Sequence, residues 1–192
     1  PDTRSANDLD TLAETVFDTL ARQFPICTSS DEFHFFPQCR IDGLDGSLWD
    51  NFSAGAIAGI CREMQRWEEC LEPVAEAPII HPSAPSSAHV VDAAMLMRMV
   101  RTLRRQLSEV RPHATQPTFY LTIAGIGLAE ALEANPSAYR SRLQSLPAFF
   151  DQAVDTLVDL PRQFRDLGIE MLERQWEWLA GLGIPDDLQR PI

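Results

Sequence analysis

The chain contains no lysine. All 16 of its basic residues are arginines; they stand against 28 acidic residues and leave a net charge of −12 at pH 7. A protein with this excess of negative charge repels phosphate backbones, which disfavours general binding to nucleic acid. Arginine forms two-pronged pairs with carboxylates that lysine cannot form, so the bias could be functional, but GC-rich coding is the simpler explanation and we adopt it.

Long apolar runs and cysteines are also scarce. No apolar run reaches the roughly 18 residues that a membrane span needs, and no basic-then-apolar signal opens the chain. The four cysteines, at positions 27, 39, 61 and 70, are too few for a fold built on disulfides. We therefore expect a cytoplasmic protein that does not engage membranes.

The motifs of common catalytic sites are missing as well. There is no His-Glu-x-x-His zinc motif, no inward-facing pair of Glu-x-x-His motifs, no glycine-rich phosphate loop and no Gly-x-Ser-x-Gly elbow. Each of these motifs places reactive groups at a fixed spacing that the chemistry requires. We therefore expect that this chain by itself is not an enzyme and needs no cofactor.

What is present is the composition of an ordinary globular protein. Of the 192 residues, 45% are apolar and 23% charged, which suits one helical domain over residues 1–192. Apolar residues recur at helical spacing, and no alternating pattern of useful length indicates a strand. The pattern predicts an all-α fold, an irregular bundle of six to seven helices. They cover about residues 7–24, 53–71, 87–110, 118–134 and 136–146, a segment that Pro147 starts and a segment from Pro161 to about residue 180. The spacing predicts that Met99 belongs to the buried stripe of the helix over 87–110. In the last segment it predicts six inward side chains: Phe164, Leu167, Met171, Leu172, Trp178 and Leu179.

One predicted helix and two irregular segments stand out. Residues 118–134 are apolar all round, which predicts a central helix, and Gly125 and Gly127 permit a close neighbour there. Residues 25–52 form a long loop rich in aromatic side chains, which predicts that the loop is ordered and packed down. Residues 73–86 are rich in proline and predict a linker or extended loop within the domain.

The aromatic-rich loop also holds a cluster of chemically active side chains. Two thiols, an imidazole and two carboxylates lie close together in sequence: Cys27, Asp31, Glu32, His34 and Cys39. Such groups could hold a metal ion, and a cysteine beside His34 could act as a nucleophile. The spacing matches no common zinc module, and the phenylalanines around His34 favour packing. We therefore favour a structural loop and expect no metal site.

A second cluster is basic. The predicted helix over 87–110 carries a strip of arginines on one side: Arg98, Arg101, Arg104 and Arg105. In an acidic protein such a strip could bind an anionic ligand or an acidic partner helix. The alternative, which we favour, is internal pairing with the surplus of carboxylates.

Three stretches carry a family resemblance: PTFYLTIAGIGLAEAL from Pro117, YRSRLQSLPAFFDQAVDTL from Tyr139 and PRQFRDLGIEML from Pro161. They resemble a bacterial family of formerly unknown function, domain of unknown function eight-eight-five, which is allied to metal-dependent carboxypeptidases. The resemblance implies a helical N-terminal half that precedes a zinc-peptidase half with a His-Glu-x-x-His motif. This chain stops before any such motif, so no catalytic residue carries over.

Three hypotheses follow. The first is a non-catalytic helical region of a metallopeptidase-like protein, whose partner is a catalytic half in the same longer chain or in a separate protein. The second is a stand-alone interaction module that uses the arginine strip or the aromatic loop; a homo-oligomer is a further option. The third and weaker hypothesis is a bundle that binds a small molecule or a metal through residues 31–39.

Overall fold

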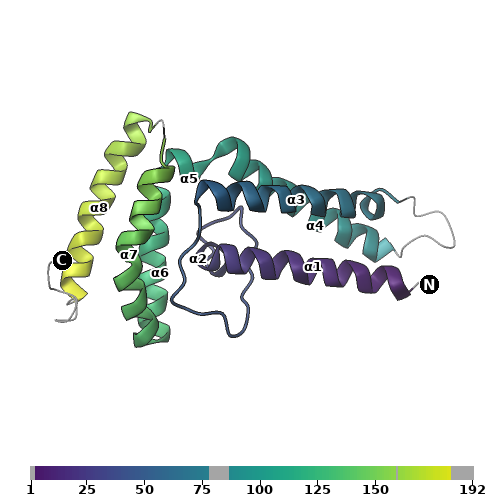
Figure 1. Cartoon of the computed structure of the whole chain (residues 1–192), viewed down its shortest axis with the longest axis horizontal. Coiled ribbons are helices and arrows are strands. Elements are labelled where there is room, and N and C mark those ends of the chain that lie inside the picture. The colour runs from purple at the N-terminus through teal and green to yellow at the C-terminus, as the bar shows by residue number, and fades with distance from the viewer. Residues whose placement is uncertain (1–2, 78–86, 159, 183–192) are drawn as a thin grey trace. The chain divides into compact units, whose positions relative to one another are not determined.

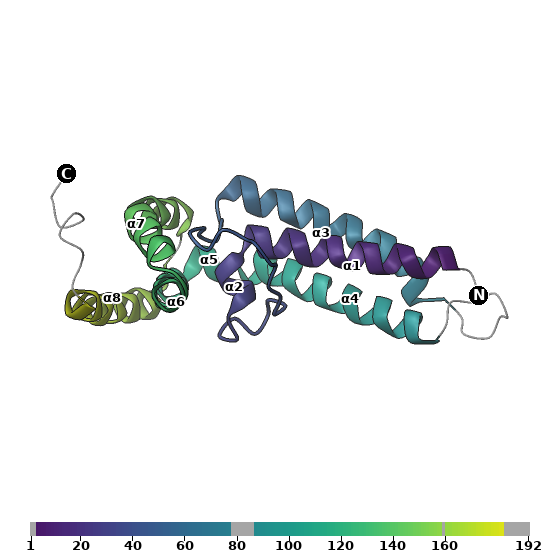
Figure 2. The ribbon, with the colours of Figure 1, turned by 90° about the horizontal axis from the view of Figure 1, so that it is seen from below.

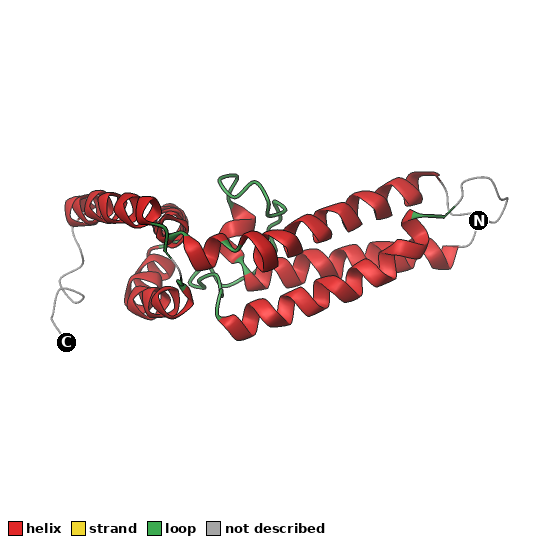
Figure 3. Ribbon diagram, turned by 90° about the horizontal axis from the view of Figure 1, so that it is seen from above, coloured by secondary structure: helices red, strands yellow, loops and turns green. Residues whose placement is uncertain are grey.

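A computed structural model describes residues 3–77, 87–158 and 160–182 of the chain, and all of its regular structure in these ranges is helical (Figures 1 and 3). The long helices are α1 (Thr3–Gln23), α3 (Ala54–Ala75), α4 (Ser87–Arg105), α6 (Pro117–Ala134), α7 (Pro136–Thr156) and α8 (Arg162–Leu182). Two short helices, α2 (Pro25–Ser29) and α5 (Pro112–Thr115), and a π-helical turn, η1 (Gln106–Val110), complete them. The predicted all-α class is confirmed. None of the described helices is long and apolar enough to cross a bilayer.

The contacts within the chain form two compact units. Unit 1 comprises residues 1–44 and 54–110, and unit 2 comprises residues 45–53 and 111–192. Each unit is described by itself below. That the whole chain acts as one domain therefore stays a prediction.

Unit 1 is built on an antiparallel pair of helices, α3 and α4, with α1 packed along α4 (Figures 1 and 2). Each helix buries most of the apolar stripe that its sequence predicts, because residues three and four apart share one face. The predicted stripe of the helix over 87–110 is not buried throughout, since Met99 is half-buried and Val110 is exposed. The stripes supply most of the buried core of this unit: Leu9, Val16, Leu20, Phe24, Ile60, Met64, Trp67, Leu71, Leu96, Val100, Leu103 and Leu107.

Unit 2 is centred on α6, which is apolar on all sides and packs against α7 and α8 (Figure 2). The predicted central position of this helix is confirmed within its unit. Two glycines permit the close approach of α8. A Cβ on Gly125 would lie 2.8 Å from Nε2 of Gln175, and a Cβ on Gly168 would lie 2.8 Å from Cγ of Pro117.

The second half of the aromatic-rich loop, residues 45–53, belongs to unit 2. Trp49 stacks on Phe149 with ring centroids 4.7 Å apart and donates its indole N–H to Ser145 Oγ at 3.0 Å. Phe52 is fully buried and meets Phe119 edge-on. The prediction that aromatic side chains pack this loop down is confirmed, although its first residues, 25–29, form helix α2 rather than loop.

Two prolines do not break helices where the sequence predicts it. The predicted boundary at Pro147 is wrong, since α7 runs without a break from Pro136 to Thr156. Pro147 is exposed, so its ring projects into solvent, and the helix loses one backbone hydrogen bond there. Pro73 lies in the last turn of α3, so the predicted linker begins later than expected. Its remaining residues from 78 to 86 lie outside the described residues.

Helix α8 buries less of its apolar surface than its sequence predicts. Phe164, Met171 and Leu179 turn inward as expected, but three other side chains that were expected inward are exposed: Leu167, Leu172 and Trp178. The reason is that, among the described elements, α8 packs mainly on α6, so one neighbour covers most of what is buried on a helix with an apolar surface on both flanks.

Candidate functional site

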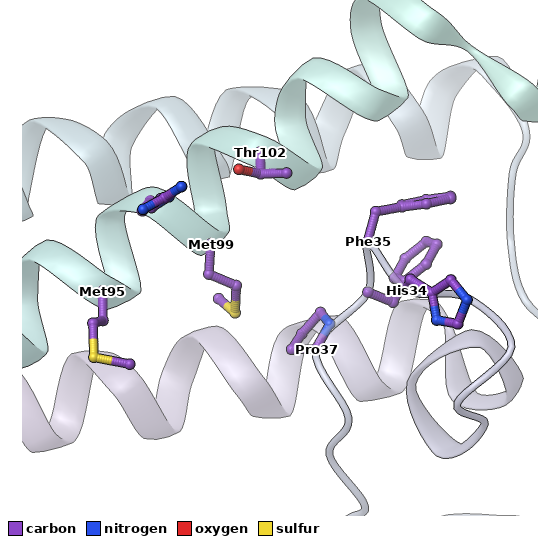
Figure 4. A pocket seen from close by; sticks show the side chains of 8 residues that line it. His34, Phe35, Pro37, Met95, Met99 and Thr102 are labelled. Atoms are coloured by element: carbon purple, nitrogen blue, oxygen red, sulfur yellow. The ribbon is translucent and has the colours of Figure 1, made fainter.

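The most distinctive cavity of unit 1 lies between the first half of the aromatic-rich loop and helix α4 (Figure 4). Its volume is about 380 Å³. The lining consists of four consecutive loop residues and four residues of one face of α4: His34, Phe35, Phe36, Pro37, Met95, Arg98, Met99 and Thr102. We call this cavity the Met–Phe pocket.

The loop side of the pocket is held in place by buried aromatic and backbone contacts. Phe36 is buried and meets Phe24, the residue between α1 and α2, edge-on with ring centroids 5.0 Å apart. The backbone N–H of Cys39 donates to the Thr28 carbonyl at 2.9 Å, which ties the end of the loop to α2. The Cys39 thiol donates to the Phe17 carbonyl of α1 at 3.7 Å. These contacts fix the pocket wall without regular structure.

The helix side of the pocket is formed by residues at a spacing of three, four and seven. This spacing places Met95, Arg98, Met99 and Thr102 on one face of α4. Figure 4 shows Met95 and Met99 extending from α4 in the same direction, with Pro37 and Phe35 of the loop on the other side of the pocket. Met95 is 66% exposed, so the mouth of the pocket is open to solvent.

The structure separates the four arginines of the predicted strip into two groups. Arg101 and Arg104 pair with Glu68 of α3, with N–O distances of 3.2 and 2.6 Å, and Arg105 pairs with Glu109 at 3.3 Å. Internal pairing, the favoured alternative, is therefore confirmed for these three. Arg98 lines the Met–Phe pocket and makes no ion pair with any residue in the described ranges.

Glu68 joins α3 to α4 from an almost buried position. Burial alone raises the pKa of its carboxyl group, but the hydrogen bonds from Arg104 and Arg101 outweigh burial and hold the pKa below its ordinary value. The carboxylate is therefore ionised at neutral pH and paired with two guanidinium groups. This cluster stabilises the helix pair and leaves neither Arg101 nor Arg104 available for a partner's carboxylate.

The side chains proposed as metal ligands do not come together. Cys27 is buried in the core, whereas Asp31, Glu32 and His34 are exposed, and the Cys39 thiol is occupied by a backbone carbonyl. Across residues 3–77, 87–158 and 160–182, no three His, Cys, Asp or Glu side chains lie close enough to hold a metal ion. The structure thus brings His34 into the pocket wall and scatters the other candidates.

Sequence reasoning missed the methionines of the pocket. Met99 was expected in the buried stripe of its helix, but it is only half-buried, and Met95 was not singled out. The spacing of Met95, Arg98 and Thr102 could have indicated them, because residues three and four apart form a second face of α4 next to the buried stripe. The spacing cannot predict that the aromatic loop lies over this face, because the loop and α4 are far apart in the sequence.

No protein-family model, no curated protein and no solved structure matches this chain. The resemblance to the carboxypeptidase-like family therefore stays a prediction that rests on the quoted motifs.

Proposed function

We propose that this chain is a non-catalytic helical module that binds a partner protein through the Met–Phe pocket. In this proposal, an apolar side chain of the partner enters between the methionines and the loop, and a neighbouring carboxylate pairs with Arg98. The observation that carries the proposal is an open apolar pocket with, at its edge, the guanidinium of Arg98, which forms no ion pair within the described part of the chain.

The chemistry of the lining supports a protein segment as the ligand. Methionine side chains are flexible and polarisable, so exposed methionines adapt to the apolar side chains of a partner. A guanidinium beside such a surface adds a charge-assisted hydrogen bond to a carboxylate and fixes the orientation of the bound segment. The combination suits an amphipathic helix that carries an acidic residue next to its apolar face.

The exposure of the pocket argues against a small molecule as the main ligand. Sites for small molecules enclose most of the surface of their ligand. Here Met95, Arg98 and Thr102 are all exposed, so a small ligand would stay largely in water. A side chain on a larger partner does not have this difficulty, since the rest of the partner covers the rim.

The proposal is tested by selecting random peptides displayed on phage against the whole chain. We expect enriched peptides in which Asp or Glu lies close to Leu, Phe or Met. Labelled synthetic copies should bind the wild-type protein, and Arg98→Glu or Met95→Glu should weaken binding by about tenfold or more, which corresponds to the loss of at least about 1.4 kcal/mol.

Two control variants match these changes. Arg62→Glu reverses an exposed charge on α3, and Val154→Glu introduces the same carboxylate as Met95→Glu at an exposed apolar position of α7. Both controls should keep wild-type affinity. Selection that enriches no sequence, or peptides that bind Arg98→Glu and Met95→Glu as tightly as wild type, would refute the proposal.

If the gene continues past Ile192 into a His-Glu-x-x-His half, as the family resemblance predicts, that half is the first natural partner to test. Binding measurements with the same four variants then decide whether the pocket is the contact.

A further inference from the structure

Helix α8 presents a second surface that is independent of the Met–Phe pocket. The helix meets α6 through Gly168, which lies against Pro117, and through Gln175, whose side-chain amide donates to the Leu121 carbonyl at 2.5 Å. Three large apolar side chains lie roughly 90° around the helix from this contact, at 3.6 residues per turn. They are Ile169, Leu172 and Trp176, which are 53%, 51% and 65% exposed.

These side chains have the spacing of a helix-pairing seam. The steps from Ile169 to Leu172 and on to Trp176 are three and four residues, and the half-buried Leu179 continues the series. This is the repeat that places apolar side chains along one side of a helix in a coiled coil. Arg165 precedes Ile169 by four residues and Glu173 follows it by four, so both lie along the same side of the helix. We call this surface the α8 seam. It consists of five side chains: Arg165, Ile169, Leu172, Glu173 and Trp176.

We propose that the α8 seam binds the α8 seam of a second copy of this chain, with the two helices antiparallel. In the register that opposes Ile169 of one copy to Leu172 of the second copy, Arg165 of one copy lies opposite Trp176 of the second. A two-fold axis relates the copies, so each of these contacts occurs twice.

Charge complementarity selects this orientation. In the antiparallel pair, the guanidinium of Arg165 lies over the indole of Trp176 and next to the carboxylate of Glu173 of the second copy, and both contacts favour a cation. In a parallel pair, Arg165 would lie beside its own counterpart, and Glu173 beside its counterpart, so like charges would repel at both ends. In the sequence, Arg165 comes before Ile169 and Leu172, and Glu173 comes after them. This order brings opposite charges together only when the two helices are antiparallel.

The other flank of α8 fits a second copy less well. It exposes Leu167 and Trp178, but Arg174 lies between them. Arg165 of the α8 seam also contacts a carboxylate of its own helix, Asp166 at 3.4 Å, but it does so from the end of the seam. Arg174 is paired with Glu170 at 2.5 Å in the middle of the other flank. An apolar side chain of another copy would have to bury this ion pair, and burying a charge is costly.

The size of the seam sets the expected affinity. Trp176 presents on the order of 150 Å² to solvent, since it is 65% exposed and a tryptophan side chain buries up to about 250 Å². An interface built on this one stripe is small beside the roughly 1,200–2,000 Å² of stable complexes. We therefore expect a dimer with a micromolar dissociation constant.

The test uses sedimentation velocity on the whole chain over concentrations from about 5 to about 500 µM, a range that brackets a weak interface. Wild-type protein should shift from monomer to dimer across this range. Trp176→Glu should weaken the dimer by about tenfold or more, whereas Val154→Glu, at a position 72% exposed on α7, should leave it unchanged. Far-UV circular dichroism verifies that both variants are folded.

A charge exchange tests the orientation. Arg165→Glu places a carboxylate opposite Glu173 of the second copy, and Glu173→Arg places a guanidinium opposite Arg165, so each variant alone should dimerise about tenfold more weakly or worse. A mixture of the two variants should form mixed dimers, and the double variant should dimerise more tightly than either single variant, because both restore opposite charges between positions 165 and 173. The double variant should stay somewhat weaker than wild type, because it lacks the cation over Trp176.

Three results would overturn the proposal. They are a wild-type chain that stays monomeric throughout the range, a dimer that Trp176→Glu leaves intact, and charge variants that fail to rescue one another. A dimer that Leu167→Glu weakens and Trp176→Glu does not would assign the contact to the other flank of α8 and refute the seam.

Discussion

Replacing Gly168 by alanine should loosen α8 from α6. The added Cβ would lie 2.8 Å from Cγ and 3.1 Å from Cβ of Pro117, closer than carbon atoms pack. A proline ring is rigid and begins α6, so it cannot swing aside as a long side chain could. The strain must be relieved by moving one helix away from the other.

The size of the effect follows from two opposing contributions. Overpacking a tight contact costs about 1–3 kcal/mol, while alanine is favoured over glycine in a helix by about 1 kcal/mol. We expect Gly168→Ala to lower the free energy of unfolding by about 1 kcal/mol, or the Tm by about 2–4 °C for a chain of this length. Gly181→Ala is the matched control on the same helix, because a Cβ there would meet no atom within 4 Å. This control should raise stability by up to about 1 kcal/mol.

Urea unfolding followed by tryptophan fluorescence and by circular dichroism measures the difference. The protein should be dilute, so that association through the α8 seam does not add to the stability of unit 2. We expect the two alanine variants to fall on opposite sides of wild type. If both stabilise the protein equally, the close approach of α8 to α6 is refuted.

Three further predictions concern single side chains. Glu68→Ala should destabilise unit 1 by about 1–2 kcal/mol in urea unfolding, because two arginines lose charge-assisted hydrogen bonds, whereas Glu63→Ala removes an exposed pair worth less than about 0.5 kcal/mol. Burial, followed by the charge of Arg111, lowers the pKa of His113 to about 4 from an ordinary 6.5, so the unfolded chain binds the extra proton first. The contribution of neutral His113 to the free energy of unfolding should therefore be complete above about pH 6.5 and should be lost as the pH falls toward 4. The Tm of His113→Phe should depend less on pH between these values than the Tm of wild type. Equal slopes of Tm against pH for the two proteins would contradict the assignment. Pro147→Ala should stabilise the chain by about 1–3 kcal/mol by restoring a helical hydrogen bond in α7, and an unchanged Tm would indicate two helices that meet at Pro147.

Helix positions follow from the sequence because their cause is local. The stripe of Ile60, Met64, Trp67 and Leu71 predicts both α3 and the face that it buries. Pro147 was misinterpreted because its cost depends on where the ring points, and a helix held by packing along its whole length tolerates one lost hydrogen bond. Whether the helix continues through Pro147 depends on the tertiary contacts of α7, and these cannot be predicted from the spacing of residues in the sequence.

The Met–Phe pocket could be predicted only in parts. The aromatic loop and the arginine strip were both recognised as candidate partner surfaces, but nothing in the sequence places His34 and Arg98 on one cavity. The division of the strip is equally non-local, since it depends on Glu68, which is more than thirty residues from Arg101 and Arg104. Long-range pairing of this kind requires the packing of α3 on α4.

The place of residues 45–53 has a consequence for how the protein is made and dissected. Trp49 leaves the ribosome 96 residues before its partner Ser145 in α7, and Phe52 leaves it 67 residues before its partner Phe119 in α6. The packing of unit 2 around these two rings therefore cannot form until α6 and α7 have been synthesised. No single cut in the chain yields both units intact. A fragment that begins at Arg111 lacks the rings of Trp49 and Phe52, which pack on α6 and α7 of unit 2. A fragment that ends at Val110 contains both rings but lacks the helices on which they pack.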